Sequence, residues 1–292
     1  MSADEQFDAF KRRVRQGVEQ TLDQYFSEYP PTRVTEAAKY AVLGGGHRWR
    51  AMAVIAAGLI FRRNAFHICT PAACGLELAH AASLVLDDAP SMDDALVRRG
   101  KPCAHLVFPP WAVDMVPAFL VNMAYEVSLR HSAASHARRV KAAIVLAEAG
   151  ACMARGQEID LAELSEDHSE ADLLRRYRLK SGALYAAAMQ VGAILCGASD
   201  DEAESLHACG MDLGLSYQFL DDIADVVAGV TEVGKASGMD ADKCTAVDVF
   251  GVGGARRRAE SFEQRALSRV DQHGPGADML RSLVRHASWA AT

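Results

Sequence analysis

The stretch LVLDDAPSMDDALVRRGKPCAH, from Leu84 to His105, crowds four aspartates together and follows them with two arginines and a lysine. Burying one carboxylate is costly, and like charges close together raise the cost. The segment LELAHAASLVL that leads into the stretch is typical of a helix buried in a bundle. Pro90 disfavours helical geometry at Ala89, so we expect this helix to be disturbed there. The aspartates therefore lie at the end of a buried helix and need positively charged partners.

A second aspartate cluster lies in QFLDDIADVVAG, where Asp221 and Asp225 are four residues apart and share one helix face. A solvated helix face would explain them, but the flanks LGLSYQFL and VVAGV look buried. In an apolar interior such carboxylates cost far more than in water unless they are neutralised. Two clusters that each end a buried helix predict opposing carboxylate faces that hold magnesium ions and, through them, a phosphorylated ligand.

Cations accompany both clusters. Arg98 and Arg99 can fork onto phosphate oxygens, and Lys101 adds a point charge. The segment GGGHRWR, residues 44–50, joins a flexible glycine turn to Arg48 and Arg50 and is another candidate anion site. Three further lysines lie in or near breaks that contain glycine: Lys180, Lys235 and Lys243. Each of these alone is more typical of a solvated surface residue, so their interpretation as ligands depends on the nearby carboxylates.

The composition narrows the class of protein. The net charge of −7 and the pI near 5.8 argue against nucleic-acid binding, which normally needs a basic face. We find no apolar run near the roughly 20 residues of a membrane span, and the N-terminal segment MSADEQFDAFKRRVRQ is charged. We therefore expect a cytoplasmic protein without a membrane span. The seven cysteines are scattered and odd in number, which predicts reduced thiols.

The fold class predicted by the pattern is all-α. Residues 4–27 carry apolar side chains at three- or four-residue spacing, as an amphipathic helix does. Thr35 is a candidate cap for a helix that ends at Gly44, and residues 172–198 form one long helical segment. Half of the 292 residues are hydrophobic, which is enough for a large core. We expect one domain over residues 1–292 with roughly ten or more helices.

In this order the motifs resemble the trans-isoprenyl diphosphate synthases, most closely the bacterial geranylgeranyl diphosphate synthases of the carotenoid-pathway type. The resemblance spans about residues 35–260, through GGGHRWR, LELAHAASL, DDAPSMDDALVRRGKP, GQEIDL, LKSG, QFLDDIAD and GKASGMDADKCT. It implies a single polyprenyl synthetase domain, in which mostly antiparallel helices surround a central cavity, and a homodimer. It also implies that isopentenyl diphosphate is joined head to tail to an allylic diphosphate, with release of pyrophosphate.

The resemblance also implies roles for individual residues. Three magnesium ions would bind the allylic diphosphate (dimethylallyl, geranyl or farnesyl) through Asp87, Asp93 and Asp221, supported by Asp88, Asp222 and Asp225. The side chains expected to contact that allylic substrate are Arg98, Lys180, Ser181, Gln218, Lys235 and Lys243. Those expected to hold isopentenyl diphosphate are His47, Arg50, His80 and Arg99, with Gly46 letting the backbone come close. The residues that carry catalysis would be Asp87, Asp88, Asp93, Arg98, Lys180, Asp221, Asp222 and Lys235.

The chain departs from the family pattern at His47, where the family has a lysine, and at Met239-Asp240, where the family has Lys-Asp. A histidine is a weaker, pH-dependent cation. A synthase with altered coupling geometry could accompany the histidine at position 47, and two other functions also stay open. One is a class I terpene cyclase, although we find no Asn/Ser/Glu metal motif in place of the second aspartate cluster. The other is a low-activity regulatory subunit of a synthase heteromer, although such subunits tend to lose one cluster.

Product length depends on the helix that precedes the first aspartates. Ala82 and Ser83 lie about one turn before Asp87, and both are small, so neither blocks a growing tail at that level. In the resembling family a large aromatic residue there shortens the product. We therefore expect geranylgeranyl (C20) rather than farnesyl (C15) diphosphate.

We predict that Ala82→Phe shifts the products toward shorter chains, because the ring would occupy the space that the tail needs. Mass spectrometry of products from isopentenyl and farnesyl diphosphates measures the shift, with Ala82→Val as a smaller step. An unchanged product profile would place the wall elsewhere in the bundle.

Overall fold

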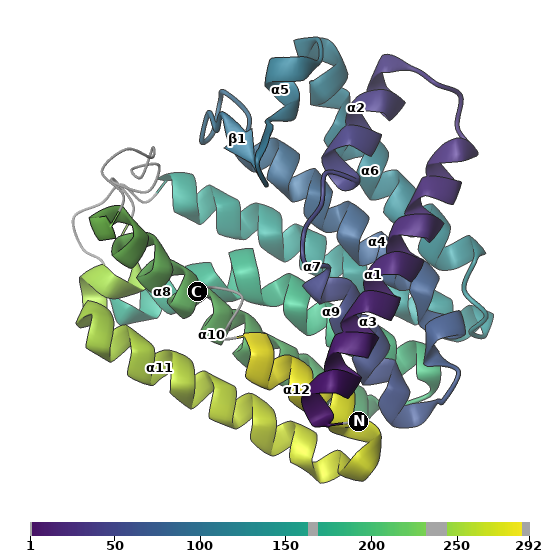
Figure 1. The fold of residues 1–292 in the computed structure, drawn as a ribbon, viewed down its shortest axis with the longest axis vertical. Helices are drawn as coiled ribbons and strands as arrows, with labels where there is room; N and C mark the ends of the chain where they lie inside the picture. The colour runs from purple at the N-terminus through teal and green to yellow at the C-terminus, as the bar shows by residue number, and fades with distance from the viewer. Residues whose placement is uncertain (1, 163–168, 232–243, 288–292) are drawn as a thin grey trace.

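The computed structural model describes residues 2–162, 169–231 and 244–287 as a bundle of α-helices, which confirms the predicted fold class (Figure 1). The helices of the amino-terminal part are α1 (Ala3–Ser27), α2 (Arg33–Val42), α3 (Trp49–Phe61), α4 (Ala65–Asp87), α5 (Ala104–Val107) and α6 (Pro110–Arg130). Those that follow are α7 (His136–Ala162), α8 (Glu170–Tyr177), α9 (Ala183–Cys196), α10 (Asp200–Thr231), α11 (Ala246–Val270) and α12 (Asp278–Ala287).

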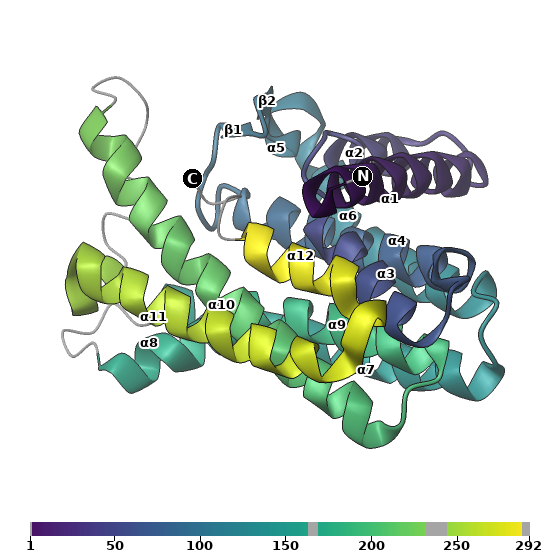
Figure 2. The same cartoon turned by 60° about the horizontal axis from the view of Figure 1, so that its bottom comes forward.

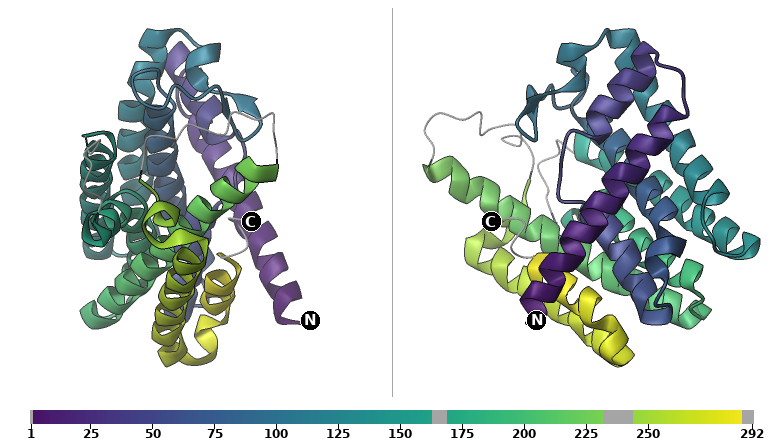
Figure 3. Two further views of the ribbon diagram at one scale, coloured as in Figure 1. Left: turned by 90° about the vertical axis from the view of Figure 1, so that its left-hand side faces the viewer. Right: turned by 45° about the vertical axis from the view of Figure 1, so that its right-hand side comes forward.

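The first two helices begin at well-formed caps. Ser2 and Glu5 form a capping box at the start of α1, whose buried face carries the apolar spacing seen in the sequence. The cap of α2 is Thr32, not Thr35 as predicted, because the Thr32 hydroxyl accepts the Thr35 backbone N–H while the Thr35 hydroxyl accepts that of Thr32. Figure 3 shows α1 along the outside of the bundle beside α12, where the Phe7 ring lies 4.6 Å from His286.

Helix α9 lies inside the bundle and is buried along its whole length except at Gln190. Its contact with α3 needs a glycine, since a Cβ on Gly192 would lie 2.0 Å from the Val54 carbonyl oxygen. Its contact with α10 needs two more, because Cβ atoms on Gly210 and Gly214 would lie 2.5 Å from the Tyr185 carbonyl oxygen and 2.8 Å from Gly182. The backbones of α3 and α10 therefore pack directly against α9.

Helix α4 ends at Asp87, just before the Ala89-Pro90 step, as predicted. Beyond it the chain turns back on itself, and the Asp93 backbone N–H donates to the Asp87 carbonyl oxygen at 3.0 Å. Figures 1 and 2 show the carboxyl ends of α4, α7 and α10 on the same side of the bundle. The fold thus brings both aspartate clusters to one end of the helices.

Residues 172–198 do not form one continuous α-helix. A π-helical turn, η1 (Arg178–Gly182), separates α8 from α9. The turn lies against α7 at Gly156, where a Cβ would be 2.4 Å from the Lys180 backbone nitrogen. A π-turn adds one residue to the local helix and so re-aims the side chains on it.

Two short strands, β1 (Val97–Arg98) and β2 (Lys101–Pro102), form a hairpin after the first aspartate cluster. The loop residues Arg99 and Gly100 both have positive φ, 55° and 74°, as the tightest hairpin turns require. Arg98 pairs with Lys101 across the hairpin, while Arg99 occupies the turn. The three cations of the opening stretch are therefore carried on one rigid loop.

Three segments are long and apolar enough to cross a membrane by length and composition alone: Ala65–Asp87, Pro110–Arg130 and Glu170–Cys196. The first and third are 72% and 78% buried within the bundle over the most apolar window, whereas α6 is only 44% buried. The expected absence of a membrane span stays a prediction.

We predict that Gly192→Ala lowers the free energy of unfolding by about 1–3 kcal/mol, because the added methyl group overlaps the Val54 carbonyl oxygen of α3. A fall in Tm of several degrees by circular dichroism would show this. Gly17→Ala in α1, whose Cβ would meet nothing within 4 Å, is the matched control and should not lower Tm. Equal melting of Gly192→Ala and the wild-type protein would contradict the direct contact.

Candidate active site

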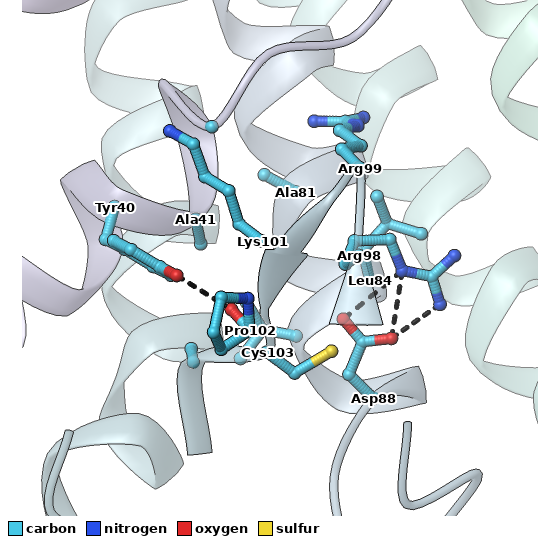
Figure 4. A pocket seen from close by; sticks show the side chains of 13 residues that line it. Tyr40, Ala41, Ala81, Leu84, Asp88, Arg98, Arg99, Lys101, Pro102 and Cys103 are labelled. Carbon is cyan, nitrogen blue, oxygen red and sulfur yellow. Dashed lines mark hydrogen bonds and ion pairs between the residues drawn. The ribbon is translucent and has the colours of Figure 1, made fainter. Parts of the chain in front are cut away.

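The first aspartate cluster is bound to the hairpin through Asp88, which is 6% exposed. Arg98 donates from Nε and Nη2 to the Asp88 Oδ1 at 3.0 and 2.5 Å (Figure 4). Tyr40 of α2 fastens the second strand by donating its hydroxyl to the Pro102 carbonyl oxygen at 2.8 Å. Asp88 and Arg98 are thus placed together, and in this structure their charges satisfy each other.

A cavity opens behind the hairpin, between it and helices α2 and α4 (Figure 4), with about 440 Å³ of empty space including its open mouth. Its walls are mainly apolar, from Ala41, Leu84 and Val85, while Arg98 and Lys101 stand toward opposite sides. The hairpin is tied to α2 by the Tyr40 hydrogen bond and to α4 by the Asp88–Arg98 ion pair.

Asp87 lies at the end of α4 in a half-buried position. The pKa of its carboxyl is raised to about 6, mainly by burial and less by the carboxylates of Asp93 and Asp88, while the cations of Lys180 and Arg98 lower it. A raised pKa means that the cations of the chain do not fully offset the cost of burying this carboxylate. Asp87 is thus a carboxylate that an added cation would favour.

Lys180 reaches this side of the site from the π-turn. Its ammonium group forms an ion pair with Asp160 of α7, and Arg176 lies 3.5 Å from the other oxygen of the same carboxylate. Asp160 is buried and serves both cations. We missed its role in the sequence, although it lies in the matched segment GQEIDL, because a single aspartate in a helix gives no signal of its partners. It sets the position of Lys180.

In the second cluster, Asp222 is buried and bound on several sides. Tyr177 donates its hydroxyl to Asp222 Oδ2, which also accepts the Ala246 backbone N–H at 2.7 Å. Gln218 donates to Asp222 Oδ1 at 3.0 Å, and the Ser181 hydroxyl donates to the Gln218 side-chain oxygen at 2.5 Å. Asp222 therefore ties α8, α10 and the start of α11 together. Tyr177 is a second residue that the sequence gave no reason to select.

Asp221 and Asp225, the other two aspartates of the second cluster, also lie on α10. Burial raises the pKa of Tyr185 and of Tyr217, and the carboxylate of Asp221 adds to both shifts. Asp225 adds to the shift at Tyr217. Because α10 runs from Asp200 to Thr231, Asp221 and Asp225 share one face of that helix, as predicted.

The candidate diphosphate pocket is built around the glycine turn. Gly45 and Gly46 have φ values of 104° and 115°, which glycine adopts without strain. Arg99 donates to the Gly45 carbonyl oxygen at 2.8 Å, and a Cβ on Gly46 would lie 2.8 Å from the Arg99 Cζ. His47 is exposed. Gly46 therefore lets the Arg99 guanidinium pack onto the backbone.

Arg48 and Arg50 differ in their surroundings. Arg48 is buried, pairs with Glu77 at 3.4 Å and donates to the Val42 carbonyl oxygen at 2.9 Å, so it anchors the turn. Arg50 stands over the Tyr185 ring at 4.7 Å, and its buried Nε has no hydrogen-bond partner in the described part of the chain. Arg50 is thus the cation of this segment that suits an anionic ligand.

His80 lies beside these arginines. Burial, and then the guanidiniums of Arg50, Arg99, Arg98 and Arg48, lower the pKa of His80 well below its usual value. The imidazole is therefore neutral, and four arginines converge around it. Arg48 and Arg98 are already paired with Glu77 and Asp88, so Arg50 and Arg99 are the cations that a diphosphate would compensate.

The oxygen chemistry of the aspartates fits magnesium. Among the described residues no three His, Cys, Asp or Glu side chains are already gathered as a metal site. Magnesium prefers a few carboxylates together with phosphate oxygens and water. Carboxylates such as Asp87 at the ends of two helices are suited to that arrangement. Lys235, Lys243 and Met239-Asp240 lie outside the described residues.

The sequence between residues 31 and 273 matches the model of the polyprenyl synthetase family. The chain belongs to the polyprenyl synthetase family. Geranylgeranyl pyrophosphate synthase 7 of Arabidopsis thaliana is 33% identical over 283 residues, which is 94% of this chain and 80% of that protein. Geranylgeranyl diphosphate synthase of Cereibacter sphaeroides is 31% identical over 95% of this chain and 94% of its own.

The fold comparison agrees with this polyprenyl synthetase assignment. The apo structure of an FPP/GFPP synthase from Zymomonas mobilis superposes with a TM-score of 0.85 at 28% identity, over 97% of this chain and 99% of that one. The resemblance seen in the motifs is therefore confirmed, and the chain is a prenyltransferase that elongates isoprenoid chains. The same family assignment gives the context in which the clustered carboxylates and arginines are interpreted.

We predict that Asp87→Asn raises the Tm of the metal-free protein more at pH 7.5 than at pH 5. The pKa of Asp87 is higher in the folded chain, about 6, than its ordinary 3.8, so its stabilisation is full below pH 3.8 and is lost as the pH rises through 6. The neutral amide avoids that loss. Thermal melts in EDTA at both pH values measure it, with exposed Asp114→Asn of α6 as control. Equal effects of Asp87→Asn at the two pH values would count against the raised pKa.

Proposed function

We propose that this prenyltransferase condenses isopentenyl diphosphate with an allylic diphosphate, dimethylallyl, geranyl or farnesyl, in a magnesium-dependent reaction that gives geranylgeranyl or farnesyl diphosphate and pyrophosphate. The observation that carries the proposal is the pairing of two unlike surfaces at one end of the bundle. Asp87 is a carboxylate that needs cations, and Arg50 and Arg99 stand around neutral His80, a place that needs an anion.

In this proposal Asp87, Asp93, Asp221 and Asp225 hold three magnesium ions that neutralise the allylic diphosphate. Asp160 keeps the Lys180 ammonium directed along α7, from where it contacts the same diphosphate. Arg98, the Ser181–Gln218 pair and the two lysines outside the described residues complete those contacts. Each group favours negative charge on the departing pyrophosphate, which lowers the barrier to breaking the C1–O bond.

The second substrate occupies the arginine pocket. Arg50, Arg99 and His80 bind the diphosphate of isopentenyl diphosphate, with Gly46 permitting close approach and exposed His47 at the edge. Its double bond attacks C1 of the allylic cation, and a proton then leaves the new chain, for which the released pyrophosphate is the acceptor. The contribution of the protein is to orient two anions side by side and to exclude water.

The roles of Asp88 and Asp222 in this scheme are to position other groups. Asp88 holds Arg98, and Asp222 holds Tyr177, Gln218 and the start of α11. Losing the contacts of Asp88 or of Asp222 would displace the groups that bind the allylic diphosphate, but it would not remove a metal ligand. We propose that both act in catalysis in this indirect way.

We also propose that two chains associate through α6 and α7. These helices pack together and share large exposed apolar side chains, among them Trp111 (60% exposed), Met115 (58%) and Ile144 (53%). Burying such side chains between two copies removes apolar area from water. We propose a cytoplasmic homodimer that uses this face, and the acidic net charge supports no nucleic-acid role.

The function is tested by incubating the purified protein with isopentenyl diphosphate and each allylic starter, with magnesium or with EDTA. We expect magnesium-dependent release of pyrophosphate and a C20 or C15 diphosphate by mass spectrometry. Arg99→Ala should raise the KM for isopentenyl diphosphate by more than about tenfold, since it removes a charged hydrogen bond. A cyclic hydrocarbon would indicate a terpene cyclase, and no turnover by the chain alone would favour a regulatory subunit.

The dimer is tested by light scattering after size-exclusion chromatography. The wild-type protein should have twice the chain mass of 31.4 kDa, and Ile144→Glu should reduce it toward one chain because a charge would be buried. Val252→Glu replaces an exposed valine of α11 and should leave the mass unchanged. A monomeric wild-type protein would contradict the proposed interface.

A further inference from the structure

Arg50 lies where a positive charge is electrostatically unfavourable. It is the second residue of α3, close to the positive end of the helix dipole. Burial, and after it the guanidiniums of Arg50, Arg99, Arg98 and Arg48, lower the pKa of His80, so Arg50 is one of several positive charges that act on this histidine. The nearby carboxylate of Glu77 is already used, because it pairs with Arg48 and accepts the Ala51 backbone N–H at 3.0 Å.

The compensating contact is the face of one aromatic ring. The Arg50 Cζ lies 4.7 Å from the centroid of the Tyr185 ring, and Tyr185 is 3% exposed. A guanidinium over an aromatic face is attracted by the ring quadrupole, and the attraction is largest where water is excluded. The buried Nε of Arg50 has no hydrogen-bond partner among the described residues, so the ring stabilises a guanidinium that lacks this hydrogen bond.

The ring itself cannot move away. On its α10 side, a Cβ on Gly210 would lie 2.5 Å from the Tyr185 carbonyl oxygen, and one on Gly214 would lie 3.2 Å from the ring carbon Cδ2. The Tyr217 ring packs at 5.8 Å. On the other side of α9, Gly192 sets the spacing to α3, the helix that carries Arg50. The distance between Arg50 and the ring is therefore fixed by backbone contacts.

We propose that Tyr185 is a positioning residue for Arg50: its ring holds the guanidinium in the diphosphate pocket and thereby sets the affinity for isopentenyl diphosphate. The inference rests on the proposed function, in which Arg50 binds that substrate. Tyr185 acts through its ring and not through its hydroxyl, and it does not touch the reacting atoms. It is thus a determinant of one substrate site only.

The test compares Tyr185→Leu, which removes the ring, with Tyr185→Phe, which keeps it. Tyr185→Leu should raise the KM for isopentenyl diphosphate about tenfold, the range of a desolvated cation–π contact, with kcat and the KM for the allylic substrate nearly unchanged. Tyr185→Phe should stay within about twofold of the wild-type protein, because the quadrupole remains. Phe66→Leu, which removes a guanidinium–ring contact with Arg13 on the outer side of α4, is the matched control and should change neither KM.

Isothermal titration of isopentenyl diphosphate gives the same comparison without turnover. In an Arg50→Met background, Tyr185→Leu should add no further loss of affinity, which a purely structural role would not predict. Tyr185→Met, which is unbranched and bulky, replaces the leucine variant if that one fails to fold. Equal KM values for Tyr185→Leu and wild type, or a phenylalanine variant as weak as leucine, would overturn the inference. A wild-type protein that binds isopentenyl diphosphate but forms no product would refute the proposed function alone.

Discussion

The contact on which the structure depends is the direct backbone packing of α3 and α10 on α9. Glycines at 192, 210 and 214 remove the side chains that would otherwise keep the helices apart, and the carbonyl oxygens of Val54 and Tyr185 fill the space. Because close-packed interiors respond to a single methyl group, this spacing has little freedom. One side of α9 therefore sets the position of α3, which carries Arg50, and the other sets the position of α10, which carries the second aspartate cluster.

The charged residues divide into two groups by what compensates them. Asp88, Asp160 and Asp222 are buried and bound by partners from other elements, which aligns the hairpin, the π-turn and the start of α11. Asp87 is only partly compensated, by Lys180 and Arg98, and its pKa is raised, while the buried Nε of Arg50 has no hydrogen-bond partner among the described residues. A ligand of alternating charge, with cations on one side and phosphate on the other, relieves both costs at once.

The sequence was sufficient where the signal is local. The apolar spacing of residues 4–27 predicts α1, and the Ala89-Pro90 step predicts the end of α4. The cap of α2 was placed at Thr35 instead of Thr32, since either threonine of a reciprocal pair fits the pattern. The fold class and the family follow from the order of the motifs, because several of them recur at consistent spacing over most of the chain.

Tertiary partners could not be predicted in the same way. Nothing in DLLRRYRLKSGALY marks a π-turn, because the segment contains no proline and its glycine follows the turn's other residues. The roles of Asp160, Tyr177 and Tyr185 depend on residues 16 or more positions away. The aspartates at 221 and 225 were placed on one helix face from their spacing, whereas the network around Asp222 needed the position of α11.

The π-turn at Arg178–Gly182 also has a geometric consequence. A π-turn is an α-helix widened by one residue, and each α-helical residue turns the axis by about 100°. With one residue fewer, α8 and α9 would run together as a regular helix. Lys180 would then be rotated about the helix axis by roughly a quarter of a turn, away from its position against α7. The extra residue of the π-turn thus sets the direction in which the Lys180 ammonium group points.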